Sequence, residues 1–215
     1  MKYDTVIFDL DGTLLNTLPD LHASVCYALE KNGMEGRTLD EVRRFVGNGI
    51  FILIKRAVRQ GSTENEILQV FEDFKAHYKE NSRVKTKAYD GVEELVAALK
   101  AEGCKLGVVS NKAHFAVCDI MEYYFKGLFH VAIGERDGVP RKPSPESVLE
   151  AIKALGGEKV LYVGDSEVDV ETAKNAGLPM AAVTWGFRSE AELKAAGAEL
   201  FAHNCNELFE IIKGN

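Results

Sequence analysis

The stretch DTVIFDLDGT, residues 4–13, holds the features that decide the fold. Its first six residues, 4–9, contain the apolar run Val-Ile-Phe and end at an acid, which is typical of a strand buried on both faces of a sheet. Asp9 and Asp11 lie two residues apart at the carboxyl end of that strand. Because side chains alternate along a strand, both carboxylates can project from one face, about 6.5–7 Å apart. The stretch therefore predicts a buried strand with two functional acids at its end.

Apolar runs of the same kind recur in the second half of the sequence. They predict strands at residues 104–110, 129–134, 159–164 and 179–184, and a shorter one at 198–202. Helical patterns lie at residues 92–99, 112–124, 145–155, 168–176 and 189–196. Strands that alternate with helices favour an open, doubly wound parallel sheet of the Rossmann-like kind. We therefore predict an α/β fold, in which ligands bind beyond the carboxyl ends of the strands.

A long helical segment interrupts this alternation near its start. Between Leu14 and about Thr86 the pattern contains no strand, and a first helix is expected at residues 18–31. A crossover between parallel strands needs only about a dozen residues. The excess predicts an inserted helical cap at residues 15–86, and the α/β catalytic core then comprises residues 1–14 and 87–215.

Composition excludes several classes of protein. The 215 residues include 26 Lys and Arg against 33 Asp and Glu, a net charge of −7, whereas nucleic-acid binders carry a basic footprint. No apolar stretch approaches the roughly 20 residues of a membrane span, and the first residues do not resemble a signal peptide. The four cysteines form no C-x-x-C pair, which is typical of reduced thiols in the cytosol. We expect a cytoplasmic protein with no nucleic-acid or membrane partner.

A second pair of acids follows the strand predicted at residues 159–164. Asp165 lies at its carboxyl end, and Asp169 lies four residues further on, near the start of the next helix. Alone, such acids are typical of a helix N-terminus. Together with Asp9 and Asp11 they place four like charges on one rim of a sheet, and such a cluster normally needs a bound cation. Carboxylate ligands completed by water and phosphate suit Mg²⁺, so the sequence predicts a magnesium site.

Two further strands contribute polar residues to the same rim. Ser110 and Asn111 end the strand at 104–110, and Lys142 follows the strand at 129–134. Each of these residues is ordinary on its own. The order of an acid pair, a hydroxyl, a lysine and a second acid pair, each after a strand, is the informative pattern.

These segments resemble the four signature motifs of the haloacid-dehalogenase-like hydrolases. The motifs are D-L-D-G-T (9–13), S-N (110–111), K-P (142–143) and G-D-S-E-V-D (164–169), and the resemblance spans the whole chain. The helical insertion also resembles the small helical cap of that family. The second acid, Asp11, is absent from true dehalogenases and favours the phosphotransferase branch.

The resemblance implies a role for each residue of these motifs. Asp9 would be the nucleophile that forms an aspartyl-phosphate, and Asp11 would be the general acid and then the general base. Ser110 would hydrogen-bond a phosphoryl oxygen, and Lys142 would neutralise phosphate charge. Thr13 and Asn111 are candidate substrate-binding residues beside them.

The metal ligands are implied in the same way. Mg²⁺ would be held by the Asp9 carboxylate, the main-chain carbonyl of Asp11 and Asp165, with Asp169 close behind. The expected partner is therefore a small phosphorylated metabolite.

The segment F-V-G-N-G within the cap, with the start D-G-T-L-L-N-T-L-P-D-L, resembles phosphoglycolate phosphatases. Arg44 is a candidate partner for a substrate carboxylate, and Gly47 and Asn48 are candidates for close approach to substrate. Asn48 is also expected to cap the following helix. Phosphoglycolate is the leading substrate. Related capped enzymes act on pyrophosphate, nucleotides or sugar phosphates, and a phosphomutase or a non-enzymatic phospho-acceptor module remain alternatives.

Overall fold

The computed structural model describes residues 1–214 and divides into two compact units. An α/β unit comprises Met1–Leu15 together with the chain from Ala88 onward, and a helical unit comprises Asn16–Lys87. The boundaries expected from the sequence lie one residue earlier at each crossing.

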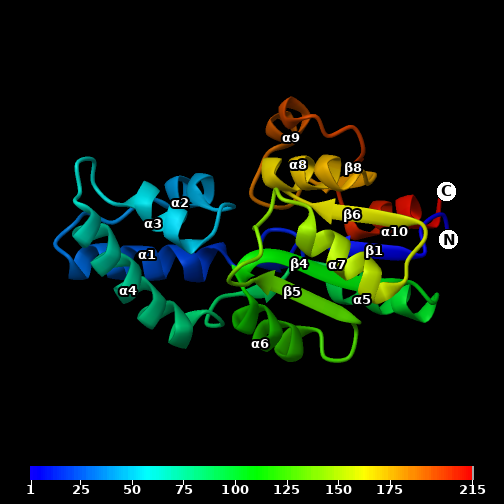
Figure 1. Ribbon diagram of the computed structural model, residues 1–215, viewed down its shortest axis with the longest axis horizontal. Helices are drawn as coiled ribbons and strands as arrows, with labels where there is room; N and C mark the ends of the chain where they lie inside the picture. Colours follow the sequence, from blue (N-terminus) through cyan, green and yellow to red (C-terminus); the bar gives the residue numbers. More distant parts are fainter. Residues whose placement is uncertain (215) are drawn as a thin grey trace. The chain divides into compact units, whose positions relative to one another are not determined.

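The α/β unit is built on one six-stranded parallel sheet (Figure 1). Its strands are β1 (Thr5–Phe8), β4 (Lys105–Ala113), β5 (Val131–Glu135), β6 (Val160–Gly164), β7 (Met180–Val183) and β8 (Phe201–Ala202). They lie in the order β5-β4-β1-β6-β7-β8, so β1 is central and Phe8 is in register with Val108 on one side and Val163 on the other. The predicted doubly wound sheet is confirmed.

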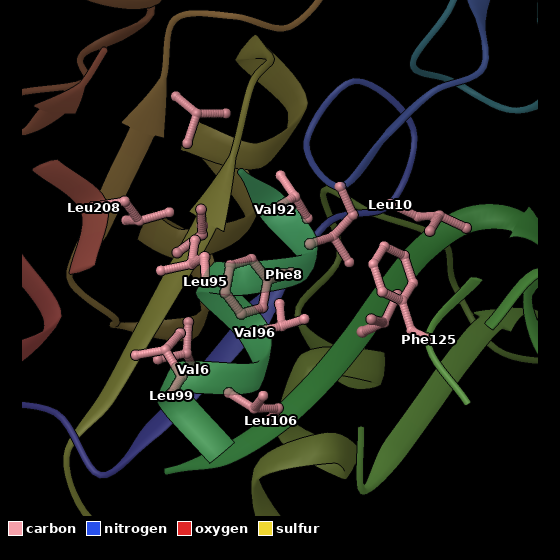
Figure 2. Packing of buried hydrophobic residues seen from close by; sticks show 14 of the residues in the cluster. Val6, Phe8, Leu10, Val92, Leu95, Val96, Leu99, Leu106, Phe125 and Leu208 are labelled. Atoms are coloured by element: carbon pink, nitrogen blue, oxygen red, sulfur yellow. The ribbon is translucent and has the colours of Figure 1, made fainter. Parts of the chain in front are cut away.

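Helices cover both faces of this sheet. They are α5 (Val92–Ala101), α6 (His114–Tyr124), α7 (Glu146–Leu155), α8 (Glu167–Ala176), α9 (Glu190–Ala196) and α10 (Cys205–Lys213). Successive residues of β1 point to opposite faces. Val6 and Phe8 pack in a cluster with α5, α6 and α10 (Figure 2), whereas Ile7 packs with α7 and α8 on the other face. Burial on both faces explains why the last three residues of β1 are apolar and why Asp9 comes only where the strand ends.

The helical unit contains α1 (Leu18–Lys31), α2 (Leu39–Phe45), α3 (Ile50–Ala57) and α4 (Glu64–Asn81). Capping boxes begin two of these helices, with Thr38 opposite Glu41 and Thr63 opposite Glu66. Among residues 1–214, no helix combines the length and the apolar character that crossing a bilayer requires.

The two crossings between the units pair with each other as a two-stranded sheet, β2 (Leu15–Asn16) with β3 (Lys87–Ala88). The expectation that no strand lies between Leu14 and Thr86 is therefore wrong for residues 15–16. Two residues are too few to show the alternation from which a strand is predicted.

Candidate active site

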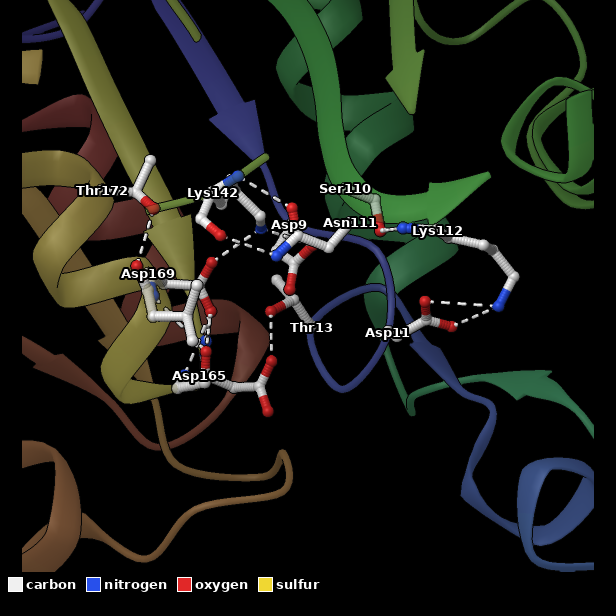
Figure 3. Close-up of polar contacts among 12 residues, drawn as sticks. Asp9, Asp11, Thr13, Ser110, Asn111, Lys112, Lys142, Asp165, Asp169 and Thr172 are labelled. Carbon is white, nitrogen blue, oxygen red and sulfur yellow. Dashed lines mark hydrogen bonds and ion pairs between the residues drawn. The ribbon is translucent and has the colours of Figure 1, made fainter. Parts of the chain in front are cut away.

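Three carboxylates meet at the carboxyl ends of two neighbouring strands. Asp9 directly follows β1, Asp165 directly follows β6, and Asp169 lies in the first turn of α8. Each offers an oxygen within 4.8 Å of the other two, and all three residues are buried (Figure 3). The central position of β1 beside β6 brings together residues that are more than 150 positions apart in the chain.

Lys142 lies among these carboxylates. Its Nζ is 2.8 Å from Asp9 Oδ1 and 2.8 Å from Asp169 Oδ1, and it donates to the Tyr162 hydroxyl at 3.0 Å. Burial alone would lower the pKa of Lys142, but the charges of Asp169 and Asp9 raise it well above its usual range. Burial opposes ionisation of Asp169 as well, yet Lys142, Ser166 and Tyr162 hold the pKa of this carboxyl below its usual value. Lys142 and Asp169 therefore form a fully charged buried pair.

The surroundings of the other two carboxylates, Asp9 and Asp165, favour their protonated forms. Burial, with the nearby charges of Asp169 and Asp11, raises the pKa of Asp9 to about 7 even though Lys142 opposes the shift. Burial and the charges of Asp169 and Asp9 raise the pKa of Asp165 well above its usual range. A cation among these oxygens would reverse this effect and keep both groups ionised.

The donor set fits a hard divalent cation. Three carboxylates face one ammonium, which leaves a formal excess of two negative charges in the cluster. Asp9 Oδ1 is buried and, within residues 1–214, accepts no hydrogen bond; Lys142 pairs with it by charge, not as a well-oriented donor. A buried oxygen without a hydrogen bond is costly unless another ligand is present. Oxygen ligands from two or three carboxylates are those that Mg²⁺ or Ca²⁺ prefers.

Close backbone packing fixes the position of Asp165. Its carboxylate accepts from Thr13 Oγ1 at 2.8 Å and from the Phe187 main-chain N–H at 2.7 Å. A Cβ atom on Gly186 would lie 2.3 Å from Asp165 Cβ and 2.4 Å from the Gly12 carbonyl oxygen. Gly186 therefore allows the loop after β7 to close over the site. No local sequence pattern marks this glycine, because its role depends on a contact with a distant segment.

Asn111 and Ser110 lie at the end of β4. Asn111 exchanges two hydrogen bonds with the main chain of Lys142, of 2.9 Å and 2.8 Å, and so fixes the segment that carries the lysine. The hydroxyl of Ser110 accepts from the Lys112 main-chain N–H at 3.2 Å. Thr13 and Asn111, which were expected to bind substrate, thus hold Asp165 and Lys142 in this structure.

Asp11 does not join the three-acid cluster, contrary to the expected crowding of four acids. Its carboxylate turns toward Lys112, whose Nζ donates to the two oxygens at 3.0 Å and 3.3 Å (Figure 3). Sequence reasoning missed Lys112 because residues 112–124 were expected to be helical. In the structure β4 continues to Ala113 and α6 begins only at His114.

The predicted cap residues lie in the helical unit. Arg44 is exposed in the last turn of α2, and Gly47 adopts a φ of 126° in the turn that follows. Asn48 does not cap α3, whose N-cap is Gly49; instead Asn48 Oδ1 accepts from Arg56 at 2.9 Å. Arg56 also donates to the Phe45 carbonyl at 2.9 Å, so this arginine holds both ends of the turn.

Comparison with known proteins assigns the family. Residues 6–183 match the family described as haloacid dehalogenase-like hydrolase. The chain belongs to this family. A phosphoglycolate phosphatase from Cereibacter sphaeroides is 37% identical to this haloacid dehalogenase-like hydrolase over 212 residues, which is 97% of each chain.

Solved structures agree in fold along the whole chain. A crystal structure of a protein from Lactobacillus delbrueckii subsp. bulgaricus superposes with a TM-score of 0.94 at 35% identity and 99% coverage of both chains. A predicted phosphoglycolate phosphatase from Haemophilus somnus gives a TM-score of 0.90 at 29% identity and 98% coverage of both chains. This haloacid dehalogenase-like hydrolase is thus similar to its relatives in both of its units.

Proposed function

We propose that this protein is a Mg²⁺-dependent phosphatase that hydrolyses a small phosphomonoester, with phosphoglycolate as its substrate. The observation that carries the proposal is the buried cluster of Asp9, Asp165 and Asp169 around Lys142. A cluster of this kind offers a nucleophile, a cation site and a fixed positive charge at one sheet edge. Phosphoryl transfer needs little else, because its catalysis is mainly positioning and charge stabilisation.

The chemistry proceeds in two displacements. A carboxylate oxygen of Asp9 attacks phosphorus and forms a P–O bond while the bond to the leaving oxygen breaks, and the proton of Asp11 passes to that oxygen. Water then attacks phosphorus, Asp11 takes its proton, and the bond between phosphorus and Asp9 breaks to release phosphate. One carboxyl group thus acts first as an acid and then as a base, and both residues return to their starting states.

Three groups hold the Mg²⁺ in this proposal: the carboxylates of Asp9 and Asp165 and the main-chain carbonyl of Asp11. The bound ion supplies positive charge that offsets the excess negative charge of the cluster. Lys142 neutralises phosphoryl oxygens from a fixed position, because Asp169 and Asn111 restrain its side chain and main chain. Ser110 offers its hydroxyl to another phosphoryl oxygen.

The leaving group is assigned from the relatives. The curated relative at 37% identity is named a phosphoglycolate phosphatase, and it aligns with both units of this chain. In the proposal Arg44, Gly47 and Asn48 contact the leaving group. Replacement of Arg44 by alanine is expected to raise KM for phosphoglycolate more than it lowers kcat.

The test is phosphate release with Mg²⁺ from a panel of phosphomonoesters that includes phosphoglycolate, a sugar phosphate and a nucleotide. The wild type is expected to release phosphate with the highest kcat/KM for phosphoglycolate. Asp9→Asn is expected to lower release by at least about a thousandfold, because an amide is not a nucleophile.

The exposed Asp137 lies outside the three-acid cluster and provides the matched control. Asp137→Asn is expected to match the wild type. If another ester gave the highest kcat/KM, the assignment of phosphoglycolate as the substrate would be refuted. Isomerisation of a sugar phosphate without phosphate release would refute the phosphatase and indicate a mutase.

A further inference from the structure

Lys112 forms a largely buried ion pair with Asp11 beside the three-acid cluster, and the proposed reaction gives this lysine no role. Lys112 and Asp11 are paired at 3.0 Å, and their side chains are 4% and 15% exposed. Lys142 already serves the phosphoryl group, so the site contains a second buried ammonium. A buried charge is costly when its partner is removed, so this pair constrains any movement of Asp11.

The position of Lys112 relates it to the leaving group. Asp9 and Ser110 follow or end neighbouring strands and are assigned to the phosphoryl group. Asp11 and Lys112 each lie two residues further along the chain. The Asp11 carboxylate and the Lys112 ammonium meet to one side of the three-acid cluster, beyond Ser110 (Figure 3). Asp11 acts on the leaving oxygen in the proposed reaction, so Lys112 lies on the side of the leaving group.

Protonation of the leaving oxygen requires the Asp11 carboxylate to turn away from Lys112 and to take up a proton from solvent, because the ion-paired carboxylate carries none. The ammonium then loses a carboxylate partner within the protein interior. A leaving group that carries its own carboxylate restores this pairing. A neutral leaving group offers no carboxylate to Lys112. The activation free energy of its reaction then includes the cost of separating Asp11 from Lys112.

We propose that Lys112 is a specificity-determining residue that exchanges the Asp11 carboxylate for the carboxylate of the substrate's leaving group. The inference rests on the proposed function and deepens it: it assigns the preference for an anionic, carboxylate-bearing ester to a residue of the α/β unit. In phosphoglycolate the carboxylate is one carbon away from the ester oxygen. In this proposal the ester oxygen of one short leaving group contacts Asp11, and the carboxylate of the same leaving group pairs with Lys112.

The experiment compares two esters of similar size, phosphoglycolate and 2-hydroxyethyl phosphate. The leaving group of the first carries a carboxylate, and that of the second is neutral. Both are assayed with Mg²⁺ for phosphate release by the wild type, Lys112→Met, Lys112→Arg and Lys105→Met. Lys105 lies at the other end of β4 and donates to the Gly156 carbonyl, so it is the matched control. The readout is the ratio of kcat/KM for phosphoglycolate to kcat/KM for 2-hydroxyethyl phosphate.

The ratio is expected to fall at least tenfold in Lys112→Met, mainly through a higher KM for phosphoglycolate. It is expected to recover in part in Lys112→Arg, which keeps the charge, and to remain at the wild-type value in Lys105→Met. If Lys112→Met does not fold, Lys112→Gln keeps a polar side chain of similar length and gives the same ratio test. A merely structural role for Lys112 would lower both kcat/KM values equally.

The outcomes separate this inference from the proposed function. Equal losses on both esters, with normal release by the wild type, would overturn the role of Lys112 alone. A wild type that releases phosphate from neither ester would overturn the proposed function and this inference with it.

Discussion

Two carboxylates of the active site, Asp9 and Asp165, lie in surroundings that disfavour their ionised forms. Asp9 and Asp165 are buried, have raised pKa values and lie within 4.8 Å of a third carboxylate. Their oxygens are also positioned by neighbours, as Thr13 and Phe187 show for Asp165. In the proposed function, a cation at this cluster would keep both carboxylates ionised.

Mg²⁺ is therefore expected to stabilise the fold as well as to support turnover. A ligand that binds only the folded state raises the free energy of unfolding, by about 2.7 kcal/mol at a hundredfold excess over Kd. Tm rises as a consequence. Thermal melting with EDTA and then with excess Mg²⁺ is expected to show a rise in Tm for the wild type and little rise for Asp165→Asn. An equal rise in both proteins would show that the ion binds elsewhere.

Gly186 provides a second prediction for a single residue. Gly186→Ala would place a methyl group 2.3 Å from Asp165 Cβ and 2.4 Å from the Gly12 carbonyl oxygen, so this packing must shift. We expect a loss of about 1–3 kcal/mol in unfolding free energy, which is the usual effect of overpacking. A loss of Mg²⁺ affinity should accompany it, since Asp165 must shift. Denaturant unfolding and Mg²⁺ titration measure the two effects, and an unchanged affinity would contradict the assignment of Asp165 as a ligand.

At the level of helices and strands, the residues of the proposed site lie at the ends of elements. The ends of elements are also where the prediction from sequence was wrong. Buried strands such as β1 and β6 were predicted from their apolar runs, because burial on both faces leaves little choice of residue. Asn111 was expected to end the strand and Lys112 to begin a helix, yet β4 continues through both residues to Ala113. They are buried there only because Lys142 and Asp11, from distant segments, supply partners.

Two other features were missed, and only the first of them depends on pairing in three dimensions. The two-residue strands β2 and β3 are defined by each other and not by any local pattern. Helix α10 was not predicted, although Asn204 caps it by accepting from the Glu207 N–H and Leu208 and Ile212 bury its apolar face. Motif spacing located the acids of the site, whereas the partners of Asp11 and Asp165 required the fold.

His203 lies between the beginnings of two helices, α9 and α10. Its ring nitrogens lie 2.8 Å from Glu207 and 3.1 Å from Glu190, and these contacts raise the pKa of His203 above its usual value. A raised pKa in the folded state means that the stabilisation is complete below about pH 6.5 and is lost as pH rises through the folded value.

The expected result is a pH-dependent difference in Tm between the wild type and His203→Gln. The wild type should melt higher than the variant at pH 6 and close to it at pH 9. Thermal melting in matched buffers at the two pH values measures this, and a difference of equal size at both would rule out a charged histidine as its cause.

The whole molecule consists of two units joined at a single pair of crossings. β2 and β3 are hydrogen-bonded neighbours, and the Tyr89 N–H donates to the Leu14 carbonyl at 3.2 Å. Strands paired in this way lie about 5 Å apart, so the ends of the α/β unit can be joined by a short linker. The α/β unit also has its own hydrophobic core on each face of the sheet.

Replacement of residues 16–87 by about four Gly and Ser residues is therefore expected to leave a folded α/β unit. It should unfold cooperatively, bind Mg²⁺ through the acid cluster and hydrolyse an unselective aryl phosphate slowly. Its preference for phosphoglycolate should decrease to the part that Lys112 provides. Circular dichroism, thermal melting and phosphate release test this, and a chain without a cooperative transition would show that the helical unit is needed for folding.

The contact of the Phe187 N–H with the Asp165 carboxylate also has a consequence for protein synthesis. The acids that form the site extend from residue 9 to residue 169, but the donor that fixes one of them comes later, at the end of the loop after β7. A chain still emerging from the ribosome therefore has no complete site until residue 187 has left the exit tunnel. The hydrogen bond that fixes Asp165 can thus form only late in the synthesis of the protein.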